Sequence, residues 1–107
     1  MVSSLISSIK GTLERIGPDW VDITVGGITY RLNVALPTVN SLGKLGDSVH
    51  LFTALHVREN SLALYGFHTE EIRLAFEALI GINGVGPRLA LSVLSRFTTE
   101  SLVDAVH

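Results

Sequence analysis

The residues best suited to chemistry lie in one short segment, Asn83-Gly84-Val85-Gly86-Pro87-Arg88. Gly84 and Gly86 have no Cβ, so they can adopt positive φ and let a ligand approach the backbone closely. Pro87 suits the first position of a helix, where an N–H would have had no partner. The amides around Val85, Gly86 and Arg88 would then point outward at a helix N-terminus, where the helix dipole favours an anion. The segment is therefore predicted to bind a backbone phosphate without reading a base, with Arg88 adding a positive charge.

Two apolar stripes flank this segment and predict the helices that hold it. Apolar residues recur at three- and four-residue spacing over residues 72–80 and again over residues 89–97. Thr69 is a suitable N-cap for the first helix, and Glu70 and Glu71 suit its positive end. The same glycines could instead simply close a tight turn between two helices. The combination of the glycines, the proline, the arginine and both helices favours phosphate contact.

This two-helix unit resembles the helix-hairpin-helix motif of DNA-binding proteins, and most of the chain resembles the Holliday-junction-binding RuvA family. The resemblance rests on four blocks in the order and approximate spacing of the family: Val25-Gly26-Gly27-Ile28-Thr29-Tyr30, Val57-Arg58-Glu59, Leu64-Tyr65-Gly66-Phe67 and Asn83-Gly84-Val85-Gly86-Pro87-Arg88-Leu89-Ala90-Leu91. It implies a first domain that assembles a homotetramer, hairpins that bind the phosphates of a four-way junction, and a RuvB ATPase motor as partner.

Alternation of apolar and polar residues predicts β-strands in the first part of the chain. The predicted strands cover residues 6–16, 21–25, 28–34, 48–57 and 61–67. Gly26-Gly27 joins the second and third as a hairpin, and a short helix is predicted over residues 36–42. The fold class is therefore α+β: a five-stranded OB-type β-barrel in residues 1–68, then an incomplete helix-hairpin-helix domain in residues 69–107.

The tip between the last two predicted strands departs from the family at one position. RuvA proteins usually have two consecutive acidic residues there, and the resemblance implies that these project at the tetramer centre and repel phosphates. This chain has Glu59 followed by Asn60. An exposed carboxylate at such a tip is otherwise an ordinary solvated turn residue. With the resemblance, we predict a weakened acidic pin that carries one charge per subunit instead of two.

The charge of the chain argues against strong DNA binding by simple attraction. The formal net charge is −2 and the pI is near 6.0, whereas most DNA binders gain affinity by neutralising phosphates. Residues 1–69 contain five basic and five acidic side chains, and residues 70–107 contain three basic and five acidic ones. Binding is therefore expected to depend on backbone amides, on Arg88 and Lys10, and on several copies of the site in one oligomer.

The chain shows no arrangement of residues typical of an enzyme or a metal site. It lacks the glycine-rich phosphate loop of ATPases, and its histidines lack metal-site spacing. We expect surface or interface positions for all four: His50, His56, His68 and His107. No cofactor or metal is predicted. The sequence has no cysteine, no apolar run near the ~20 residues that span a membrane and no signal peptide, which predicts a cytoplasmic protein.

The resemblance also predicts further segments that come later in RuvA proteins. These proteins have a second helix-hairpin-helix, a linker and a small domain that contacts the RuvB motor, whereas this chain ends at His107, within a third helix predicted to begin near Thr98. We therefore expect an N-terminal portion with weakened DNA binding and little motor stimulation.

The main prediction is a non-catalytic subunit that binds Holliday junctions in branch migration, recombination and DNA repair. One alternative is an oligomerisation module in which the hairpin is only a turn. Another is a barrel that binds single strands, for which the 7% aromatic content is low.

Overall fold

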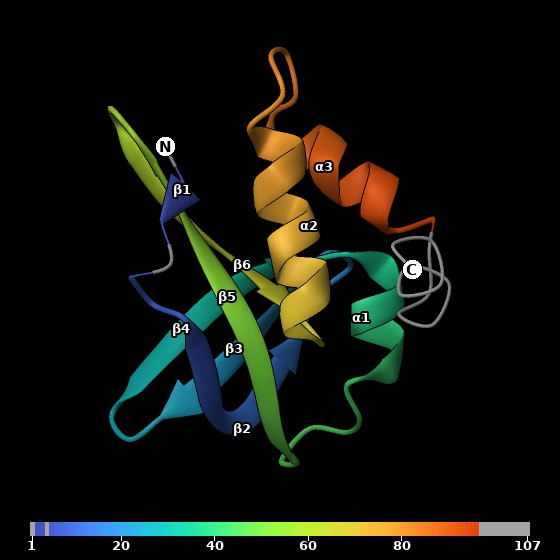
Figure 1. Cartoon of the computed structure of the whole chain (residues 1–107). Coiled ribbons are helices and arrows are strands. Elements are labelled where there is room, and N and C mark those ends of the chain that lie inside the picture. Colours follow the sequence, from blue (N-terminus) through green and yellow to red (C-terminus); the bar gives the residue numbers. More distant parts are fainter. Residues whose placement is uncertain (1, 4, 97–107) are drawn as a thin grey trace.

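Six strands form one sheet that curls into a barrel, and helices pack against its outside (Figure 1). The structure is a computed structural model and describes residues 2, 3 and 5–96. The strands are β1 (Val2–Ser3), β2 (Ser8–Ile16), β3 (Trp20–Val25), β4 (Ile28–Val34), β5 (Ser48–Arg58) and β6 (Ser61–Phe67). The helices are α1 (Leu36–Ser41), α2 (Glu70–Ile80) and α3 (Pro87–Leu94).

Strand pairing closes the barrel with β2 to β6. The pairs β2–β3, β3–β4, β2–β5 and β5–β6 are antiparallel, and the parallel pair β4–β6 completes the ring, with Leu32 opposite Leu64. This arrangement confirms the predicted OB-type barrel. The sequence did not predict β1, because two residues are too short to show a periodicity. It also placed the first long strand from Ile6, whereas β2 begins at Ser8 and the Ile6 carbonyl accepts a hydrogen bond from the Thr53 hydroxyl.

Apolar side chains from four strands, β2 to β5, form the buried core of the barrel. The buried core consists of Ile9, Leu13, Val21, Ile23, Leu32, Val34, Val49 and Leu51. Gly66 on β6 faces this core, and a Cβ added there would lie 2.8 Å from Leu32 Cδ2 and 3.1 Å from Leu51 Cδ1. The glycine in the block Leu64-Tyr65-Gly66-Phe67 is therefore explained by packing inside the barrel.

A second apolar cluster attaches the helices to the barrel. It consists of Ala54, Tyr65, Phe67, Phe76, Ala90 and Leu94. The ring centroid of Phe76 on α2 lies 5.0 Å from that of Tyr65 and 4.9 Å from that of Phe67, and both partners are on β6. β5 serves both clusters, because its buried side changes between Thr53 and Ala54. The helices are thus held against one wall of the barrel, which fixes where the loop between them lies.

The helix starts confirm the local signals in the sequence. The Thr69 hydroxyl caps α2 by accepting a hydrogen bond from the Ile72 N–H at 3.2 Å, and Glu70 and Glu71 occupy its first turn. α3 begins at Pro87 as expected. The helix predicted from Thr98 lies outside the described residues. No helix within residues 5–96 is both long and apolar enough to cross a membrane.

Candidate nucleic-acid interface

The loop between α2 and α3, residues 81–86, is a tight turn closed by its own backbone. The Ile82 N–H donates to the Leu79 carbonyl and the Val85 N–H donates to the Ile82 carbonyl, both at 3.1 Å. We expected the Val85 amide to face a ligand, but the turn uses it. The amides of Gly86 and Arg88 make no hydrogen bond within the described part of the chain. These two amides, at the start of α3, are therefore the donors left for an anion.

The two glycines of this loop have different conformations. Gly84 has a φ of +84°, which only glycine adopts without strain. Gly86 has a φ of −94° and a ψ of 177°, so the expected positive φ is absent there. Gly86 is the N-cap of α3, whose extended backbone any residue can adopt. A Cβ at either position would have no atom within 4 Å. Neither residue is thus a glycine because of crowding within the subunit.

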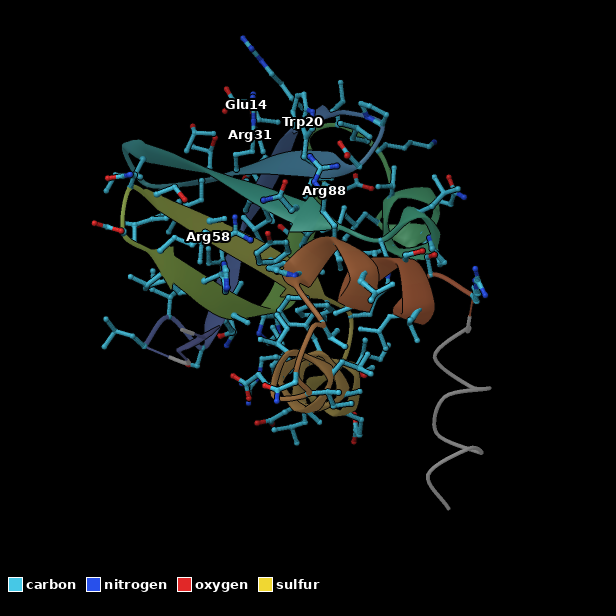
Figure 2. All side chains as sticks on the ribbon, turned by 90° about the horizontal axis from the view of Figure 1, so that it is seen from above. Glu14, Trp20, Arg31, Arg58 and Arg88 are labelled. Atoms are coloured by element: carbon cyan, nitrogen blue, oxygen red, sulfur yellow. The ribbon has the colours of Figure 1, made fainter. Side chains whose placement is uncertain are left out.

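Arg88 faces a cleft between α3 and the β5–β6 hairpin. The cleft has a volume of about 280 Å³. Its walls contain His56, Arg58, Ser61, Ala63 and Tyr65 from the hairpin, and Gly86, Pro87, Arg88 and Leu89 from the start of α3. Figure 2 looks onto this side, with Arg58 on β5 and Arg88 on α3. Sequence reasoning placed Arg88 here but missed Arg58 and His56, because no local pattern links a strand to a helix thirty residues later.

Lys10 lies apart from this cleft within one subunit. It is exposed on β2 and pairs in register with His50, near the start of β5. Arg58 ends the same strand eight residues later, which corresponds to roughly 26 Å of extended chain. The structure therefore does not bring Lys10 together with Arg88.

Glu59 and Asn60 form the exposed turn at the tip of the β5–β6 hairpin, where Arg58 pairs with Ser61. The tip and the α2–α3 loop extend from the same end of the molecule, at the top of Figure 1. Glu59 has no ion-pair partner among the residues that the structure describes. Its predicted role as a pin depends on a neighbouring subunit.

Two other arginines are held by carboxylates within the subunit. Arg31 donates to both carboxylate oxygens of Asp22, at 2.8 and 3.0 Å, and its guanidinium lies 3.8 Å from the centroid of the Trp20 ring. The hydrogen bond from Arg31 lowers the pKa of the buried Asp22. Arg73 is paired with Glu70 and Glu77, each at 3.1 Å. The positive charges of Arg31 and Arg73 are thus neutralised within the subunit. Arg58 and Arg88, in contrast, have no carboxylate partner in the described residues.

The described histidines differ in burial, and His56 departs from the surface or interface position expected for it. His50 is exposed, His56 is only 9% exposed, and His68 is half-buried beside Ser41, with Nε2 2.5 Å from the serine hydroxyl. His56 is buried because its part of β5 faces the helices rather than solvent. Within the described residues, no cluster of histidines and carboxylates could hold a metal ion. His107 lies outside these residues.

Comparison with known proteins decides the family. A family model described as the RuvA N terminal domain matches residues 5–66, which form most of the barrel. The chain belongs to the RuvA family. The four sequence blocks that suggested RuvA are thereby confirmed as a family resemblance.

Individual RuvA relatives are similar along nearly the whole chain. The chain is 46% identical to the Holliday junction branch migration complex subunit RuvA of Roseiflexus sp. (strain RS-1) and 43% identical to that of Dehalococcoides mccartyi (strain CBDB1), each over 102 residues. Each alignment covers 95% of this chain and 52% or 53% of the relative. The chain thus spans about half the length of the curated RuvA relatives it matches. Any alignment of 102 of its 107 residues includes the α2–α3 loop.

Proposed function

We propose that this RuvA-family chain binds four-way DNA junctions as a non-catalytic subunit of a branch migration complex. The observation that carries the proposal is the start of α3, where the unbonded amides of Gly86 and Arg88 lie beside the Arg88 side chain. The names of the relatives support the same function. The proposal includes a cytoplasmic location, a homotetramer and a RuvB-type motor as further partner.

The proposed contact is between the loop and one DNA phosphate. A phosphate oxygen accepts hydrogen bonds from the two amides, and the helix dipole and the Arg88 guanidinium stabilise its negative charge. Such contacts position the backbone and carry no base sequence. Selectivity for a junction then comes from geometry, because several copies of the loop in one oligomer must reach the arms of the same DNA molecule.

Glu59 has the opposite role in this proposal. Four copies of the β5–β6 tip would meet at the crossover, and their carboxylates would repel phosphates there. Asn60 halves the charge relative to the usual acidic pair. Junction unwinding by Glu59→Gln should therefore differ from that of the wild type, and identical unwinding would remove the pin from the proposal.

The aromatic residues do not favour binding of single strands. None of the Phe, Trp and Tyr side chains in residues 5–96 is fully exposed. Trp20 lies against Gly17 on the barrel, where an added Cβ would be 2.1 Å from the ring, and Arg31 covers the ring as well. Stacking of bases needs open aromatic faces, so this alternative has little support.

The experiment uses Gly86→Asp with Gly27→Asp as its matched control. Aspartate is a preferred N-cap residue, so it should preserve α3 while its charge repels a phosphate at the loop. Gly27 lies in the exposed β3–β4 turn, has no positive φ and would have no atom within 4 Å of a Cβ. Binding is measured to a four-way junction, a duplex and a single strand of equal length at two salt concentrations, with oligomeric state followed by ultracentrifugation.

The proposal predicts that the wild type and Gly27→Asp both prefer the junction. It also predicts that Gly86→Asp loses this preference while its oligomeric state stays the same. A wild type that assembles but does not prefer the junction would overturn it and favour the oligomerisation module.

A further inference from the structure

The outer part of the β5–β6 hairpin extends beyond the strands that close the barrel. β2 pairs with β5 only as far as Phe52, and β4 pairs with β6 only from Leu64 onward. Three residue pairs of the hairpin, ending with Arg58 opposite Ser61, therefore lie beyond both neighbouring strands. A hairpin of two strands is only marginally stable in water. Any further strand on this part of the hairpin thus contributes directly to the order of the tip, which contains Glu59.

β1 is the described strand that supplies this support. It pairs antiparallel with β5, with Val2 opposite His56 and Ser3 opposite Leu55. β6 lies along one edge of β5, so β1 occupies the other edge, the same one that β2 occupies nearer the start of β5. Figure 1 shows β1 beside the outer part of β5. The base of the protruding hairpin is therefore three-stranded.

The segment between β1 and β2 is attached to the same edge of β5. The Thr53 N–H donates to the Ser7 carbonyl at 3.0 Å, and the Thr53 hydroxyl donates to the Ile6 carbonyl. Thr53 is completely buried, so water does not compete for these bonds. The backbone that leads from β1 into the barrel is thus fixed, and it holds β1 beside the hairpin.

The family match does not extend to β1. The matched residues are 5–66, and β1 precedes them. The residues of the two apolar clusters lie between Ile6 and Leu94. Loss of β1 pairing should therefore leave the barrel and the helices folded while it changes the support of the hairpin.

We propose that β1 is a brace that positions the tip of the β5–β6 hairpin and so holds Glu59 in a fixed place relative to the barrel. Its pairing ends at His56, three residues before Glu59. The effect on DNA rests on the proposed function, in which the Glu59 carboxylate repels phosphates at the crossover. A carboxylate on a tip that moves away on contact with DNA repels a phosphate less, because Coulomb repulsion falls with distance.

The first test measures the brace without DNA. The double variant Val2→Pro with Ser3→Pro removes both N–H groups of β1, one of which must point toward β5 because successive amides of a strand alternate between its edges. The matched control, Val2→Ala with Ser3→Ala, keeps both amides. Hydrogen exchange of the amides of residues 61–64, followed by NMR, should be about tenfold faster in the proline variant, as expected for the loss of one or two hydrogen bonds.

The amides of Val21 and Ile23 in β3 provide the internal reference for this test. They should exchange at the wild-type rate in both double variants. Equal exchange of residues 61–64 in the proline and alanine variants would refute the brace. Faster exchange in β3 as well would show a general loss of stability and would also overturn the proposal.

The second test asks whether the brace acts through Glu59. Opening of base pairs at the crossover of a four-way junction is followed with a fluorescent base analogue. Glu59→Gln is compared with its parent in the wild-type chain and again in the proline variant, which forms a double-mutant cycle. The effect of Glu59→Gln should be smaller in the proline variant than in the wild type and in the alanine variant. An equal effect in all three would show that β1 does not position Glu59.

The two tests separate this inference from the proposed function. A wild type without junction preference would refute the proposed function, and the exchange result would then decide the brace by itself. A wild type that prefers the junction, while both double variants exchange alike, would refute the brace alone. Faster exchange at residues 61–64 together with a reduced effect of Glu59→Gln would establish it.

Discussion

Substituting the two glycines of the α2–α3 loop should have different effects on stability. Gly84 has a φ of +84°, and a Cβ added there would meet no atom within 4 Å, so Gly84→Ala changes only the backbone preference. The left-handed conformation costs a residue with a Cβ roughly 1–2 kcal/mol. Reduced freedom of the unfolded chain returns about 0.4–1 kcal/mol. The net loss is about 1 kcal/mol, which lowers Tm by roughly 4–8 °C in a domain of this size.

Gly86→Ser should leave the stability unchanged or raise it slightly. The φ of −94° and ψ of 177° are allowed for any residue, and the position is open. Serine caps a helix better than glycine by a few tenths of a kcal/mol. The same side chain would stand where the Gly86 amide is proposed to meet a phosphate. Gly86→Ser should therefore weaken junction binding while preserving the fold.

Urea unfolding and junction binding of both variants provide the assay, with binding measured at a temperature where each is fully folded. Gly84→Asn is a useful intermediate, because asparagine tolerates a positive φ better than alanine. A Gly84→Ala variant as stable as the wild type would refute the conformational argument. A Gly86→Ser variant that binds the junction as tightly as the wild type would refute the close approach of DNA to the amide.

Three further predictions concern the packing and the titration of the fold. Gly66→Ala should cost about 1–3 kcal/mol in urea unfolding, because its Cβ would lie 2.8 Å from Leu32 Cδ2 inside a closed barrel. Phe76→Ala should cost about 3–5 kcal/mol, and amide hydrogen exchange should accelerate in α2 and α3 more than in the barrel. Burial lowers the pKa of His56 and of His68, so the unfolded state binds protons first as the pH falls below about 6.5. Stability should therefore fall from pH 7 to pH 5, by at most about 1.4 kcal/mol per pH unit and per histidine, and His56→Gln together with His68→Gln should flatten the curve.

The barrel was largely predictable because apolar and polar residues alternate along most of its strands. β3 and β4 show this alternation in sequence on either side of Gly26-Gly27, although Asp22 is buried where it pairs with Arg31. The register confirms the hairpin with Val25 opposite Ile28. β5 shows where the pattern fails. Its buried side changes between Thr53 and Ala54, since one half faces the barrel core and the other faces the helices. That change depends on elements later in the chain, so it made the expected position of His56 wrong.

The candidate site was predictable only where its signals are local. The Thr69 cap and the start of α3 at Pro87 follow from neighbouring residues and are confirmed. The extended backbone of Gly86 was not predictable, because a glycine permits both signs of φ. Arg58 and His56 were missed for a different reason. Their position opposite Arg88 arises from the packing of the second apolar cluster, which no short window of sequence contains.

The net charge of −2 is a poor guide to whether this chain binds DNA, because charges act locally. Salt screens exposed charges beyond about 8–10 Å. The carboxylates of Glu70 and Glu71 begin α2, whose eleven residues span roughly 16 Å, so they lie at the far end of that helix from the α2–α3 loop. Arg58 and Arg88 line one cleft, and no carboxylate is among the described residues that line it. The binding constant of one subunit should depend only weakly on salt, because one subunit has only a few unpaired cations. Each phosphate that a cation neutralises contributes about 0.9 to the slope of log K against log salt. Steep salt dependence of junction binding would therefore require several subunits on one DNA molecule, which makes the slope itself a measure of how many copies bind together.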